Sequence, residues 1–259
     1  FGYLTGMAVP LVNLATILTA SLAVSIVPAI SEARALKDTQ RVYNQTAAAV
    51  RISNFVCFPA FVVVLVLATP ISTLIYNAPG AGPAVLVSSF SIVLLGLHQV
   101  STAVLQGLGH PKIPMINMIL AAVVKVVLNW VLTAIPWLGI MGAAWATAAD
   151  MGVAAVINLY FIRRYIGYRM ELLQFCKTMA AAAVMAGAVY VFYGFVMHTF
   201  AVNAAATFGS VLVGVVVYVA ALLLIGGLLE EDMARIPFIG SLSIRFLRRI
   251  GVFHTGAKS

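Results

Sequence analysis

The chain has 259 residues, of which 63% are hydrophobic and only 8% charged, against roughly 45–50% and about 25% in a soluble globular domain. Its 15 Lys and Arg and 7 Asp and Glu side chains are too few to cover a water-exposed surface. This excludes an ordinary soluble fold, a disordered chain and a disulfide scaffold. The net charge of +8 does not indicate a nucleic-acid partner, because the basic residues are spread over separate loops.

Seven apolar segments are long enough to cross a bilayer as helices, which takes about 20 residues each. Their apolar residues are continuous, whereas the strands of a membrane β-barrel would alternate polar and apolar positions. The sequence therefore predicts an all-α fold, a polytopic membrane helix bundle of about seven transmembrane helices. The predicted spans are residues 4–30, 52–76, 84–107, 113–135, 138–162, 178–200 and 205–229.

The first predicted span is unusually polar. Asn13 and Thr16 carry groups that can satisfy a locally opened helix or line a polar route. The alternative is hydrogen bonding between neighbouring helices, without any functional role. In the third span, His98 is expected to be a hydrogen-bonded interior residue and not a metal ligand, because no Cys, Asp or second His accompanies it.

Basic residues lie in alternate loops. The loops after the first, third, fifth and seventh spans hold 14 of the 15 Lys and Arg residues, and the loops around 77–83, 136–137 and 201–204 hold none. The positive-inside rule therefore places the basic loops in the cytoplasm and residue 1 outside. Cys57 and Cys176 fall near the reducing cytoplasmic side, so we expect no disulfide.

Two basic segments are expected to be helical outside the spans. Mixed charges in the first cytoplasmic loop, residues 31–51, predict a short amphipathic helix that leads into the second span. In the tail, residues 230–259, apolar residues recur at helical spacing beside three arginines, which predicts a helix on the anionic inner leaflet. The alternative for this tail is a frayed end with incidental basic residues.

Two charged residues lie inside predicted spans, where each costs about 2.5–3.5 kcal/mol or more. Lys125 is in the middle of the fourth span and Asp150 in the middle of the fifth. Counted from the turn between these spans, their depths differ by about 3 Å, within reach of one Lys side chain. They form either a charged site in a central cavity or an ion pair that neutralises itself, and the two interpretations are compatible.

A polar stripe runs along the fourth span. Asn117, Ala121, Lys125 and Asn129 follow one another at i, i+4 spacing, so they share a helix face that points to protein or water. The candidate substrate-binding residues are therefore Lys125, Asn129, Asn117, Asp150, Asn13 and Thr16.

No catalytic motif is present in the sequence. It has no Walker A loop, no HExxH and no GxSxG, so we expect neither an enzyme nor a bound cofactor or metal. A transporter needs only a cavity, polar groups that line it and helices that move.

Several segments together resemble stage V sporulation protein B-like polysaccharide flippases, of the multidrug/oligosaccharidyl-lipid/polysaccharide exporter superfamily. The resemblance covers residues 1 to about 165 and includes Lys125 with Asn129. The family places a proline after Leu14, where this chain has Ala15, so a proline kink is not expected there. The other matching segments are 4–13 (LTGMAVPLVN), 21–33 (SLAVSIVPAISEA), 105–109 (LQGLG) and 139–144 (GIMGAA).

The resemblance implies a transporter of two six-helix lobes around a central cavity, which moves lipid-linked saccharides or peptidoglycan precursors across the bacterial cytoplasmic membrane. Residues 1–165 would form the C-terminal lobe with five transmembrane helices, 166–229 two additional helices, and 230–259 the basic tail. The first residue is Phe1, and the charge distribution predicts it on the outer side of the membrane. We therefore expect a fragment whose N-terminal lobe is missing. Lys125 would then be a cavity cation for the anionic lipid-linked substrate.

Two other functions fit the same residues. In a drug or cation antiporter of the same superfamily, Asp150 would bind the coupling ion and a cationic substrate. In a non-transporting scaffold for cell-envelope assembly, the seven spans would serve as a docking surface.

Overall fold

The apolar segments fold as helices, because in lipid a helix satisfies the hydrogen bonds of its own backbone. The structure is a computed structural model that describes residues 2–226, and it contains no strand within that range. Its helices are a π-helical turn Tyr3–Ala8, α1 Val9–Ala15, α2 Ile17–Ala35, α3 Thr39–Val66, α4 Ala68–Tyr76, a 3-10 turn Pro79–Ala81, α5 Gly82–Gly107, α6 Lys112–Thr133, α7 Ile140–Ile166, α8 Leu172–Phe200 and α9 Asn203–Ile225.

Seven of these helices are long and apolar enough to cross a membrane, which confirms the predicted all-α polytopic bundle. The chain is therefore a multi-pass membrane protein. The helix predicted in the basic tail lies outside the described residues.

Three predicted boundaries were wrong. The second span, predicted at 52–76, is divided at Leu67 (φ −101°, ψ 21°) into α3 and α4. The first span is not one helix, because the chain leaves helical geometry at Thr16 (φ −99°, ψ 5°) between α1 and α2. The loop predicted at 31–51 is also much shorter, because the Asp38 side chain accepts a hydrogen bond from the Arg41 backbone N–H (2.8 Å) and so starts α3 at Thr39. The predicted amphipathic segment is thus the first part of the spanning helix.

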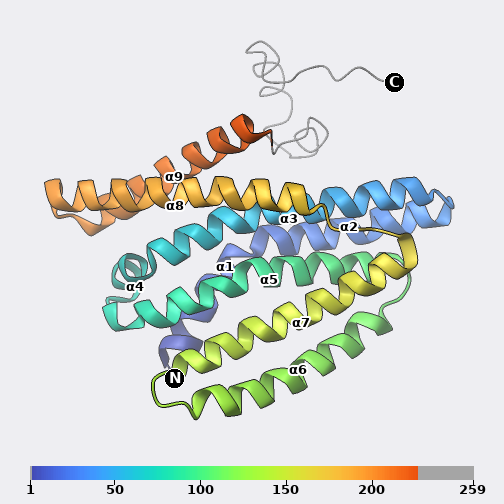
Figure 1. The fold of residues 1–259 in the computed structure, drawn as a ribbon, viewed down its shortest axis with the longest axis horizontal. Coiled ribbons are helices and arrows are strands. Elements are labelled where there is room, and N and C mark those ends of the chain that lie inside the picture. Colours follow the sequence, from blue (N-terminus) through green and yellow to red (C-terminus); the bar gives the residue numbers. More distant parts are fainter. Residues whose placement is uncertain (1, 227–259) are drawn as a thin grey trace.

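Helix α5 lies at the centre of the bundle (Figure 1). It packs against α2, α3 and α7, and 61% of its apolar window is buried. Helix α6 packs mainly on α7 at one edge and buries only 11% of its window, while α8 and α9 pair with each other against α3. In the described residues, α5 is therefore the central helix, α6 forms one edge of the bundle, and the α8–α9 pair forms the other edge.

The connections lie at opposite ends of the bundle, as the alternation of basic loops predicts. The turns between α2 and α3, α5 and α6, and α7 and α8 gather at one end of Figure 1. The connections near Pro79, between α6 and α7, and between α8 and α9 gather at the other. The basic loops therefore share one end.

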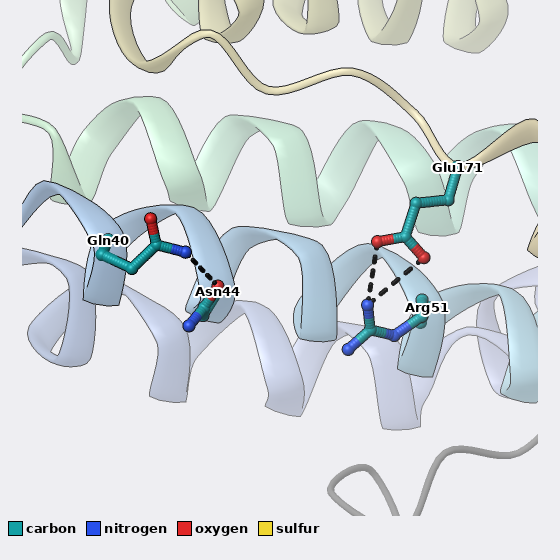
Figure 2. Close-up of polar contacts among 4 residues, drawn as sticks. All are labelled: Gln40, Asn44, Arg51 and Glu171. Carbon is teal, nitrogen blue, oxygen red and sulfur yellow. Dashed lines mark hydrogen bonds and ion pairs between the residues drawn. The ribbon is translucent and has the colours of Figure 1, made fainter. Parts of the chain in front are cut away.

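An ion pair ties the α7–α8 connection to α3. The Arg51 Nη1 atom lies 3.0 Å from Glu171 Oε1 and 3.3 Å from Oε2 (Figure 2). Beside it, the ring of Tyr168 packs edge-on against Tyr43 with centroids 5.6 Å apart. Burial, reinforced by the Glu171 charge, raises the pKa of Tyr168, so the phenol stays neutral. This cluster fixes where the α8–α9 pair joins the bundle.

Loss of this ion pair is expected to lower stability more than loss of an exposed one. Glu171→Gln removes the carboxylate charge that pairs with the Arg51 guanidinium, which is only 12% exposed, and should lower stability by about 2 kcal/mol. The matched control is Glu32→Gln, whose pair with Arg41 is 42% and 61% exposed and contributes about 0–1 kcal/mol. Thermal unfolding of the purified protein in detergent measures both. Equal shifts in the midpoint would contradict the role of Arg51.

The orientation predicts which loops react from outside. A membrane-impermeant maleimide on intact cells is expected to label Gly80→Cys and Trp137→Cys, both exposed sites, but not Lys37→Cys until the cells are permeabilised. Cys176 is an exposed thiol and should first be replaced by Ser, whereas Cys57 is buried. The opposite labelling pattern would overturn the topology.

Candidate functional site

Lys125 of α6 and Asp150 of α7 form an ion pair between these two helices. The distance from Lys125 Nζ to Asp150 Oδ2 is 3.4 Å, which confirms that the two charges lie at matching depths. The Asp150 side chain is 12% exposed and that of Lys125 is 40% exposed. The carboxylate is thus enclosed by protein, while the ammonium retains an open side.

That open side faces a cavity of about 370 Å³, a volume within the range of about 300–1,000 Å³ typical of small-molecule sites. Three predicted residues, Asn13, Lys125 and Asn129, line it. Asp150 does not line it but holds Lys125 from behind. The remaining lining residues are Leu4, Thr5, Val9, Val12, Ser88, Ser91, Leu95, Ala143, Thr147 and Met151.

The lining groups combine one cation with neutral donors and acceptors. Two amides and the hydroxyls of Thr5, Ser88, Ser91 and Thr147 line the same cavity as Lys125, among apolar side chains. An ammonium group offers three donors, and Asp150 accepts from it at one position. The cavity is therefore suited to a ligand that carries both negative charge and hydroxyl groups.

Asn117 lies elsewhere, in a buried amide network. Its Nδ2 donates to Asn158 Oδ1 at 2.8 Å, and Asn158 Nδ2 donates to Thr102 Oγ1 at 3.0 Å and Ser101 Oγ at 3.3 Å. These bonds join α6, α7 and α5. The sequence analysis missed Asn158, although its position eight residues after Asp150 places it on the same face of α7.

Thr16 also does not reach the cavity. It is 2% exposed, and its hydroxyl donates to the backbone carbonyls of Val12 (3.1 Å) and Asn13 (3.2 Å). One turn later, Thr19 Oγ1 donates to Gln99 Oε1 of α5 at 2.7 Å. Thr16 thus supports the break between α1 and α2, and Thr19 attaches that break to α5.

A second cavity, of about 520 Å³, lies between α2 and α5 on the other side of this break. It is lined by Ala20, Ala23, Val24, Val27, Pro28, His98, Gln99, Thr102, Ala103 and Gln106. The hydrogen bond expected for His98 is not observed, since its buried Nδ1 has no partner among the described residues. No sequence pattern indicates this cavity, because its residues come from two helices about 78 positions apart.

Metal binding finds no support in residues 2–226, where no three His, Cys, Asp or Glu side chains gather closely enough to hold an ion.

Comparison with known proteins gives a consistent result. Residues 8–229 match the family described as lipid II flippase MurJ. The chain is 29% identical over 250 residues to stage V sporulation protein B of Bacillus subtilis, covering 95% of this chain and 47% of that protein. The similarity therefore continues through α8 and α9, beyond residue 165.

Two further relatives carry flippase names. The lipid II flippase MurJ of Bacillus subtilis is 25% identical over 171 residues, which cover 63% of this chain and 30% of that protein. The probable low-salt glycan biosynthesis flippase Agl15 of Haloferax volcanii is 22% identical over 174 residues, covering 66% and 36%. The chain spans about half the length, or less, of these curated relatives.

The amide network predicts a stability effect without a loss of function. Asn158→Ala leaves the amide of Asn117 without its partner, and transmembrane hydrogen bonds contribute about 0.6 kcal/mol each, so the melting temperature should fall. The matched control is Val156→Ser, which changes an exposed residue of the same helix, α7. Detergent thermal unfolding and transport are measured together. A loss of transport at unchanged stability would contradict a structural role for Asn158.

Proposed function

This chain belongs to the lipid II flippase MurJ family, and we propose that it contributes to moving a lipid-linked saccharide or peptidoglycan precursor across the cytoplasmic membrane by alternating access. The observation that carries the proposal is Lys125, a cation at the wall of an interior cavity with its acidic partner behind it. Because the chain spans about half the length of stage V sporulation protein B, we propose that a first lobe completes this cavity.

The charge of Lys125 suits a phosphate-linked substrate. Attraction between opposite charges strengthens as the dielectric constant falls, so an interior ammonium attracts a pyrophosphate far more strongly than one in water does. Asp150 contacts the ammonium at 3.4 Å but does not line the cavity, so the remaining donors of Lys125 stay available to an anion. Asn13 and Asn129, with amides that donate and accept, would hold phosphate oxygens or sugar hydroxyls.

The two cavities support the alternating-access part of the proposal. Val9, Val12 and Asn13 line the first, whereas residues from Ala20 to Pro28 line the second. The break at Thr16 lies between these two groups of residues, and Thr19 bonds Gln99, which lines the second cavity. A change of bend at this break would alter both cavities together.

The ion pair also bears on the antiporter alternative. A cation antiporter would use Asp150 as its binding carboxylate, but the Lys125 ammonium 3.4 Å away already neutralises that group. The unshared donors of Lys125 favour an anionic substrate over a cationic one.

The test uses transport by the complete protein in proteoliposomes loaded with a fluorescent lipid-linked saccharide. Lys125→Met is expected to abolish transport while insertion remains normal, because Met keeps much of the side-chain length and removes the charge. Val127→Met, at an exposed position of the same helix, is the matched control and should transport normally.

A double variant separates binding from structure. If Lys125 only neutralises Asp150, then Lys125→Met with Asp150→Leu restores both stability and transport, since no charge remains buried. If Lys125 binds the substrate, stability returns and transport does not. Recovered transport in the double variant would leave Lys125 without a role in substrate recognition.

A further inference from the structure

A small basic pocket lies at the end of the bundle that carries the basic loops, away from the Lys125 cavity. We call it the Arg34 pocket; its volume is about 210 Å³. Four segments meet there: the α2–α3 turn, the start of α3, the α5–α6 loop and the end of α7. The lining residues are Arg34, Lys37, Asp38, Thr39, Val42, Leu108, His110, Tyr165 and Ile166.

Its two cations have no acidic partner. Neither Arg34 nor Lys37 makes a side-chain hydrogen bond or ion pair within residues 2–226. The nearby acidic groups are engaged elsewhere: Glu32 pairs with Arg41 at 3.0 Å, and Asp38 accepts the Arg41 backbone N–H at 2.8 Å. Asp38 also lines the pocket, so the lining carries two positive charges against one negative charge and keeps a net positive charge.

The backbone of the α5–α6 loop and of the α2–α3 turn shapes the pocket around these two cations. Gly109 has φ +74°, and a Cβ atom there would collide with the Arg34 guanidinium, so glycine leaves room for that group. His110 stacks on Tyr165 with ring centroids 4.3 Å apart, which makes a flat aromatic wall. Lys37 has φ 57° at the end of α2, a position where glycine is the usual residue.

We propose that the Arg34 pocket binds the phosphate of an anionic phospholipid headgroup from the inner leaflet. Basic pockets between transmembrane helices on the cytoplasmic side recognise such headgroups, and a guanidinium fork matches phosphate oxygens in pairs. The pocket is smaller than the range of about 300–1,000 Å³ for drug-sized ligands, and its volume suits a phosphate and its linker. The proposal does not depend on which substrate the protein transports.

The decisive variant is Lys37→Gly. Glycine adopts the backbone conformation of this position more readily than lysine, so the variant removes the cation without destabilising the turn. Lys112→Ala is the matched control, because Lys112 is an exposed cation at the same end that does not line the pocket. Arg34→Gln tests the second cation independently.

Retention of phosphatidylglycerol by the full-length protein is measured by native mass spectrometry during lipid titration in detergent. Lys37→Gly and Arg34→Gln are each expected to weaken retention about fivefold, the order expected for one cation near an anionic leaflet. Lys112→Ala should leave it unchanged. Equal retention by wild type and Lys37→Gly would overturn the proposal.

Three further probes identify the source of the phosphate. Phosphatidylcholine should be retained less than phosphatidylglycerol, and inorganic phosphate should not displace the bound lipid. Equal retention of phosphatidylcholine, or displacement by inorganic phosphate, would overturn the lipid assignment. Farnesyl diphosphate is the third probe. If it displaces the bound lipid at a lower concentration than phosphatidylglycerol does, the pocket binds a prenyl-linked diphosphate, and the phospholipid assignment is overturned as well.

Discussion

The need to neutralise a charge inside an apolar bundle determines how α6 is held. Helix α6 buries little apolar surface, and in lipid there is no hydrophobic force to press it against its neighbours. It is held instead at three levels along α7. Near the outer turn, Gly142 lets the α7 backbone approach that of Leu132; in the middle Lys125 pairs with Asp150; and further along Asn117 bonds Asn158. These contacts fix the register of the two helices.

In the proposed function, the same arrangement would link substrate binding to helix position. The Lys125 ammonium is both a contact of the α6–α7 interface and the charged group of the cavity wall. An anion bound in the cavity would compete with Asp150 for that ammonium and so weaken the middle contact, whereas Asn117 and Asn158 do not line the cavity. A ligand shifts a conformational equilibrium only through contacts that differ between its states, and this ion pair provides such a contact.

Sequence reasoning succeeded where the signal is local or depends on depth in the membrane. Hydropathy gave the seven spans, and counting from the α6–α7 turn placed Lys125 opposite Asp150. It failed where partners are far apart in the chain. Arg51 and Glu171 are 120 positions apart, so no periodicity connects them. The helices that line the cavity between α2 and α5 are likewise far apart in the sequence. Asn158, in contrast, shares a helix face with Asp150 and could have been found from the sequence.

The break at Thr16 shows how the first span bends without the proline that the resemblance places at position 15. A proline would remove a backbone N–H and leave a carbonyl unpaired, at a cost of several kcal/mol in lipid. Thr16 keeps its N–H, which is shared between the carbonyls of Val12 and Asn13 at 3.2 Å each, and its hydroxyl donates to the same two carbonyls. Because these hydrogen bonds can be exchanged, the bend is not fixed covalently. The proposed alternation between the two cavities would require such a reversible bend.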